Sequence, residues 1–145
     1  MSTTWILTAH RAGAHLYESR GAGSDWQLVE DVPHPEGRLK DGEIDTDRPG
    51  HVIDRHRPHA MEREQSATDR LADDFARELA DRLSRARAES RFGRLVLVAA
   101  PRFLGRLRDA LDGPTQATVA ASLAKDFPSP DPRAIRAALA DTILV

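Results

Sequence analysis

The pattern of apolar and polar positions at the start of the chain predicts three short β-strands. Residues 4–8 form a β-prone apolar run, and apolar positions alternate along residues 14–18 and 26–32. Gly13 lies in the break between the first two runs, where a tight turn needs a residue with permissive backbone angles. Because consecutive strands most often pair with each other, we expect a meander of three antiparallel strands.

Helical periodicity dominates residues 66–92. Large apolar side chains recur there at the spacing of one helix face: Leu71, Phe75, Leu79 and Leu83. Ser66 with Asp69 resembles a capping box, and Gly93 is well placed to end a helix. The pattern therefore predicts one long helix that begins at Ser66.

The remaining sequence predicts two further β-α units. The continuous apolar run at residues 95–98 fits a strand buried on both faces. Pro101 suits the first turn of a helix closed by Gly113, residues 117–123 form a weaker strand, and Asp131 begins the last helix. The order β-β-β-α-β-α-β-α predicts an α/β, ribonuclease H-like fold, with helices packed on a five-stranded mixed sheet.

Composition narrows the class of protein. A chain of 145 residues suits one domain, so we expect residues 1–145 to fold together. The absence of cysteine excludes disulfides, thiolate zinc sites and thiol catalysis. No apolar run approaches the ~20 residues that span a bilayer, and the N-terminus lacks a secretory signal pattern. We therefore expect a cytoplasmic protein without a membrane span. The net charge of -2 argues against a general nucleic-acid coat protein but leaves room for a local basic patch.

The predicted fold order suggests a two-metal nuclease, which needs carboxylates at strand ends. The first strand offers Thr8, Ala9 and His10 there, and the buried strand ends at Ala99 and Ala100. Neither end carries an acid, so the sequence argues against this activity. The chain also lacks a nucleophile elbow, a Walker loop and a dinucleotide fingerprint. We therefore predict no cofactor.

Residues 34–65 are expected to form a long loop, because they are rich in proline and polar residues and offer little to a core. Loops of this length are usually functional or disordered. The second half of the segment is rich in arginine. Two interpretations stay open: a solvated loop, or contact with an anionic partner such as RNA phosphate. The candidate partner-binding side chains are Arg38, Lys40, Arg48, Arg55, Arg57 and Arg63.

Two histidines in the same segment, His56 and His59, are the candidate metal ligands. Pro58 lies between them, and a solvated or phosphate-facing pair is the alternative. We predict no bound metal.

Four stretches carry a family resemblance: TWILTAHRAGAHLYE, HPEGRLKDGEIDTDRPGH, the run from DDFARELADRL to GRLRDAL, and LAKDFPSPDPRAIRAAL. Their most specific parts are residues 37–41, 47–50 and 95–105. In this order and wording the chain resembles the bacterial host-attachment family, described as proteins required for attachment to host cells. The resemblance covers nearly the whole chain.

That family is distantly similar to the central domain of archaeal and eukaryotic peptide-chain release factors. Those domains carry a Gly-Gly-Gln tip before their first long helix, and Gln65 with Ser66 and Ala67 echoes it here. The resemblance makes Gln65 the candidate catalytic residue. Arg63 and Glu64 replace the two glycines, however, and glycines let the backbone approach a scissile ester closely. This departure argues against peptidyl-tRNA hydrolysis.

Two functions follow as expectations. The first is a non-enzymatic cytoplasmic binding module that affects attachment indirectly, through RNA, the ribosome or a protein partner. The second is a release-factor-like peptidyl-tRNA ester hydrolase or ribosome-rescue factor. The sequence leaves the oligomeric state open.

Overall fold

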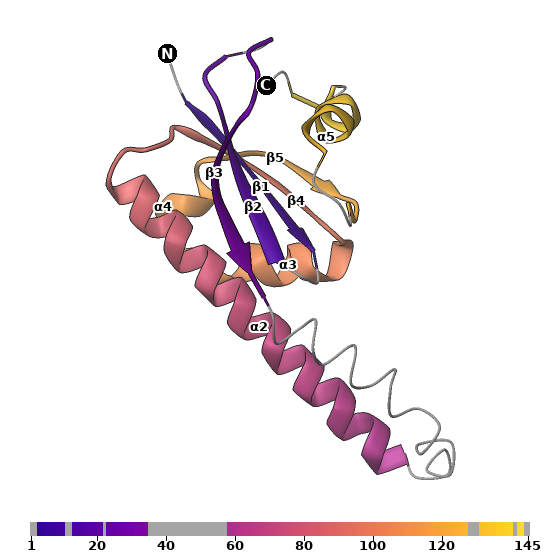
Figure 1. Cartoon of the computed structure of the whole chain (residues 1–145). Helices are drawn as coiled ribbons and strands as arrows, with labels where there is room; N and C mark the ends of the chain where they lie inside the picture. Colours follow the sequence, from indigo (N-terminus) through magenta and orange to yellow (C-terminus); the bar gives the residue numbers. More distant parts are fainter. Residues whose placement is uncertain are drawn as a thin grey trace.

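A five-stranded mixed sheet forms the centre of the protein (Figure 1). The computed structural model describes residues 3–10, 13–21, 23–34, 58–127, 131–140 and 142–143. The strands within these ranges are β1 (Thr4–His10), β2 (Gly13–Ser19), β3 (Gln27–Pro33), β4 (Arg94–Ala99) and β5 (Val119–Ala124). They lie in the order β3-β2-β1-β4-β5. β2 is antiparallel to β1 and to β3, whereas β4 is parallel to β1 and to β5. The predicted meander and the predicted five-stranded mixed α/β sheet are confirmed.

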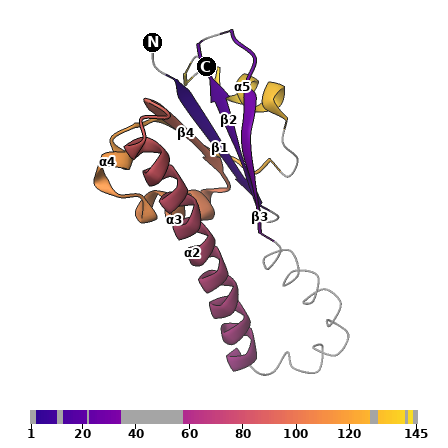
Figure 2. The ribbon, with the colours of Figure 1, turned by 60° about the vertical axis from the view of Figure 1, so that its left-hand side comes forward.

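Helices cover both faces of this sheet (Figures 1 and 2). Those of the described residues are α2 (Pro58–Ala88), α3 (Pro101–Ala110), α4 (Gly113–Gln116) and α5 (Pro132–Leu139). α2 and α3 pack on one face, where side chains such as Leu7, Leu79 and Leu107 are almost fully buried. α5 packs on the other face, where Ile135 contacts the cluster that contains Ile6. No helix in the described ranges has the length and apolar character needed to cross a membrane.

Gly13 is required by the close approach of β2 and β3. Its φ is +153°, and a Cβ built on it would lie 2.5 Å from the carbonyl oxygen of Val32. Any other residue would meet backbone there and not a flexible side chain. The predicted need for glycine at this turn is confirmed, and its main cause is the neighbouring strand.

The predicted start of the long helix at Ser66 is wrong, because α2 begins at Pro58. Proline is favoured in the first turn of a helix, where its missing N–H is not needed. Residues 60–65 are mostly strong helix formers, so propensity extends the helix upstream of the apolar stripe. The expected loop at residues 34–65 therefore gives way to helix from residue 58 onwards.

α2 extends well beyond the sheet at its amino-terminal end (Figures 1 and 2). Along residues 67–88, where side chains are described, the first buried one is Phe75. A 31-residue helix is about 46 Å long at 1.5 Å per residue. Only its carboxyl-terminal part packs on the sheet.

Gly113 does not close α3 as the sequence analysis expected. α3 ends at Ala110, and Gly113 is the first residue of the short helix α4. Asp112 caps α4: its side chain accepts a hydrogen bond from the backbone N–H of Thr115 at 2.8 Å. Asp112 and Pro114 together form a helix start, which has the stronger local signal here.

Candidate functional site

Polar side chains gather on the α5 side of the sheet, towards the carboxyl end of β1. Thr8 and His10 lie two residues apart on β1, so both point to the face that also carries Ile6. In the register of the sheet, Thr8 is paired with His15 of β2, and His15 is paired with Asp31 of β3. Three neighbouring strands thus contribute to one cluster, which we call the histidine cluster: Thr8, His10, His15 and Asp31.

The two imidazole rings of this cluster are hydrogen-bonded to each other. His10 Nε2 lies 3.2 Å from His15 Nε2, and the ring centroids are 5.3 Å apart. His15 Nδ1 also forms a hydrogen bond with Asp31 Oδ1. An ionised carboxylate only accepts, so Nδ1 of His15 carries a proton. Nε2 of a neutral His15 is then the acceptor, and His10 donates to it from Nε2.

Burial sets the protonation of this cluster. It lowers the pKa of His10, and a charge on His15 lowers it further, while the Asp126 carboxylate acts in the opposite direction. Burial also raises the pKa of the nearby Tyr17, with added contributions from Asp31 and Asp131. The cluster therefore favours a neutral His10 at neutral pH.

Thr8 is the buried member of the cluster. Thr8 is 3% exposed, and its buried Oγ1 has no hydrogen-bond partner among the residues that the structure describes. A buried hydroxyl without a partner is destabilising by about 1–3 kcal/mol. Such a group in a native structure indicates a bound water, an ion or a functional role.

The histidine cluster lies at a junction in the chain topology. β1 and β4 are adjacent and parallel, yet β1 turns back into β2 while β4 leads into α3. His10 is the last residue of β1. In open α/β sheets, ligands bind beside the carboxyl ends of strands where neighbouring connections diverge in this way.

The metal-binding capacity of the described residues is limited. No three His, Asp or Glu side chains in those ranges form a group that could hold a metal ion by themselves. His10 and His15 supply two imidazole nitrogens, and Asp31 orients one of the rings.

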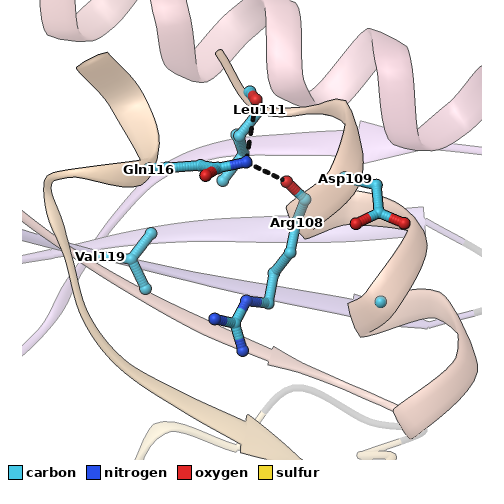
Figure 3. Close-up of a pocket in the computed structure, with 6 residues that line it drawn as sticks. Arg108, Asp109, Leu111, Gln116 and Val119 are labelled. Atoms are coloured by element: carbon cyan, nitrogen blue, oxygen red, sulfur yellow. Dashed lines mark hydrogen bonds between the residues drawn. The ribbon is translucent and has the colours of Figure 1, made fainter. Parts of the chain in front are cut away.

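A hollow of about 410 Å³ lies between α3, α4 and β5 (Figure 3). Gln116 ties α4 to the end of α3 there, because its Nε2 donates to the carbonyls of Arg108 at 2.9 Å and Leu111 at 3.2 Å. The Arg108 guanidinium points away from these bonds (Figure 3). The lining residues are Gly105, Arg108, Asp109, Leu111, Gln116 and Val119.

The side chains singled out from the sequence fall outside the described part of the chain. This holds for Arg38, Lys40, Arg48, Arg55, His56 and Arg57. The backbone of His59, Arg63 and Gln65 belongs to α2, but their side chains are not described. Their predicted roles stay predictions.

Sequence reasoning missed the histidine cluster. Part of its signal was present, since His10 and His15 flank the turn at Gly13, but only His15 lay in a predicted strand. What the sequence lacked was the register that brings Asp31 beside His15.

Comparison with known proteins gives one family match. The family model described as "Protein required for attachment to host cells" matches residues 5–139. No curated protein matches the sequence of the chain.

Solved structures give only distant likenesses. An archaeal translation termination factor is 10% identical, and the match covers 87% of this chain and 31% of that protein, with a TM-score of 0.47. A second archaeal protein is 8% identical, with coverages of 87% and 30% and a TM-score of 0.45. The chain thus spans about a third of the length of either protein. At these TM-scores neither likeness carries a conclusion about function.

Proposed function

Because the chain belongs to the family of proteins required for attachment to host cells, we propose that it is a non-enzymatic binding module for RNA. Ribosomal RNA is the most abundant RNA in a cell and is therefore the first partner to test. The module acts in the cytoplasm, so its effect on attachment is indirect. Its binding side chains are the arginines and lysine of residues 34–65.

The length of α2 ahead of its contact with α3 is the observation that supports this proposal. Asp69 of α2 contacts α3 through Arg106. Residues 58–69 therefore extend about 16 Å ahead of that contact. Arg55 and Arg57 directly precede Pro58 in the chain, so the basic residues join the end of α2 farthest from the sheet. A long extension suits a partner too large to enter a pocket.

Charge pairing in the body of the protein supports the same choice of surface. Arg82 pairs with Glu30 at 2.7 Å, and Arg106 pairs with Asp73 at 2.6 Å. Arginines whose charge is already matched by carboxylates contribute little to phosphate binding. Residues 48–64 hold four arginines and three carboxylates, close to the amino-terminal end of α2.

A salt series on a labelled single-stranded ribosomal RNA fragment tests this proposal. Fluorescence anisotropy gives the dissociation constant at each salt concentration. The logarithm of the association constant should fall with slope of about −0.7 per phosphate contact. The triple variant Arg48→Gln, Arg55→Gln and Arg57→Gln should weaken binding and make this slope shallower. The matched control, Arg77→Gln with Arg85→Gln and Arg133→Gln, removes the same charge elsewhere and should bind like the parent.

Three outcomes would replace the proposal. Equal losses in both triple variants would show that net charge alone governs binding. A partner captured from lysate that resists ribonuclease treatment would indicate a protein partner. Release of peptide from peptidyl-tRNA by the parent, lost in Gln65→Ala, would favour an ester hydrolase instead.

A further inference from the structure

The distance between the two imidazoles of the histidine cluster is close to that of two ligands on one metal. His10 Nε2 and His15 Nε2 are 3.2 Å apart. Two nitrogens at about 2.0–2.1 Å from a tetrahedral Zn²⁺ lie about 3.3 Å from each other. The same pair of atoms that shares a proton can therefore share a metal ion after a small side-chain adjustment.

Asp31 supplies the orientation that metal-binding histidines usually have. His15 donates from Nδ1 to the Asp31 carboxylate, which leaves Nε2 with its lone pair directed at His10. A carboxylate that accepts from the non-coordinating nitrogen fixes the tautomer and raises the basicity of the ligand. His15 is thus already in the tautomer that coordinates through Nε2.

Thr8 gives an independent indication of a ligand at this place. Its buried Oγ1 has no partner in the described part of the chain, and Thr8 is paired with His15 across the β1–β2 ladder. By strand alternation its side chain lies on the same face as His10. A water molecule bound to a metal at the two histidines would give this hydroxyl its missing hydrogen bond.

From these three observations we propose that His10 and His15 bind one divalent transition-metal ion, represented by Zn²⁺, through their Nε2 atoms. In the metal-bound form His10 carries its proton on Nδ1. Asp31 orients His15, and Thr8 bonds a metal-bound water. Because two protein ligands leave coordination positions open, the remaining ligands are water or groups of a bound partner. This site is separate from residues 34–65 and does not depend on RNA binding.

Zn²⁺ titration of the full chain, stripped of metal by a chelator, tests the site by calorimetry. One ion per chain is expected. His10→Ala and His15→Ala should each abolish the transition, and Asp31→Asn should weaken binding about 10- to 100-fold. His34→Ala is the matched control, because His34 stacks on Phe75 on the opposite side of the sheet, with ring centroids 4.2 Å apart. This variant should bind Zn²⁺ like the parent.

Thr8→Val separates a metal site from a merely structural cluster. Valine has nearly the shape of threonine and removes only the hydroxyl, so the metal-free variant should unfold at the same or a higher urea concentration. Its affinity for Zn²⁺ should nevertheless fall several-fold. Co²⁺ added to the parent should give the intense visible absorption of a four-coordinate ion, and His10→Ala should not.

Two results would overturn the proposal. One is Zn²⁺ binding by the parent no tighter than by the double variant His10→Ala and His15→Ala. The other is binding that survives this double variant and is lost in His56→Ala with His59→Ala, which would assign the metal to the other histidine pair. Urea midpoints measured for each variant without metal keep loss of folding distinct from loss of the site.

Discussion

Arg106 of α3 and Asp73 of α2 form an ion pair across the helix interface, with Nη1 2.6 Å from Oδ1. The same guanidinium reaches Asp69, donating from Nη2 to Oδ1 at 2.8 Å and from Nη1 to the backbone carbonyl at 3.2 Å. The Arg106 side chain is 19% exposed, so water and salt screen it less than a surface pair. This arginine fastens α3 to α2 just before Phe75, where α2 enters the core.

Replacement of Arg106 should loosen this junction. In Arg106→Leu, two carboxylates one helical turn apart lose their shared donor, and we expect a loss of about 1–3 kcal/mol in the free energy of unfolding. Urea denaturation gives this value. The control is Arg77→Leu, whose exposed pair with Asp74 at 3.7 Å should contribute no more than about 0.5 kcal/mol. Equal effects of the two variants would mean that the Arg106 contacts have no special role.

Two glycine-to-alanine variants should change stability in opposite directions. Gly13→Ala places a Cβ 2.5 Å from the Val32 carbonyl at a positive φ, and we expect it to destabilise the protein by about 2–4 kcal/mol. Gly105→Ala adds a Cβ within α3 that meets nothing within 4 Å, and it should stabilise by about 0.5–1 kcal/mol. Thermal unfolding of both variants beside the parent checks the signs. A neutral Gly13→Ala would disprove the close approach of β2 and β3.

Asp112 should make the stability of the protein depend on pH in the acid range. The hydroxyl of Ser84, followed by the donors of Thr115, lowers the pKa of Asp112 from 3.8 to about 2. A carboxyl whose pKa is lower in the folded state stabilises the fold above its unfolded pKa and loses that contribution as the pH falls towards its folded pKa. The melting temperature should therefore decrease as the pH is lowered from about 4 to about 2. Asp112→Asn keeps a capping side chain without this titration, so its melting temperature should fall less steeply. Parallel curves for parent and variant would contradict this role.

Arg136 should hold α5 against the β2–β3 connection. Its guanidinium donates to the carbonyl of Ser24 and lies over the Trp26 ring, 5.2 Å from the centroid. In Arg136→Leu, amides of α5 should exchange with solvent faster, while the urea midpoint changes little. Hydrogen exchange read by mass spectrometry measures this difference. Arg133→Leu on the same helix is the control, and an equal increase there would show that any loss of charge on α5 has this effect.

The sheet could be predicted from the sequence because strands buried in a core have local runs of apolar, β-prone residues. Residues 4–8 and 95–98 are apolar and β-prone, and β1 and β4 lie side by side at the centre of the sheet, buried on both faces. The last helix was predicted equally well, since Asp131 accepts hydrogen bonds from the backbone N–H groups of Arg133 and Ala134. Each of these elements can be recognised from a few neighbouring residues in the sequence.

What the sequence did not predict depends on contacts between distant residues. His15 reaches Asp31 only through the register of β2 with β3, and a slip by one residue would turn His15 to the opposite face. Trp26 is partly buried against the cluster that contains Tyr17, and its contact with Arg136 joins residues far apart in the chain. The start of α2 was missed because an apolar stripe marks only the part of a helix that packs.

Because α2 extends beyond its contact with α3, a small rotation there is amplified at the end of the helix. The rotation would occur about the Arg106 junction with Asp69 and Asp73, and the end that moves is Pro58. With an arm of about 16 Å, a tilt of about 10° at the junction displaces Pro58 by about 3 Å. A tilt of that size would therefore shift the attachment point of residues 34–57 by almost the separation of two consecutive Cα atoms.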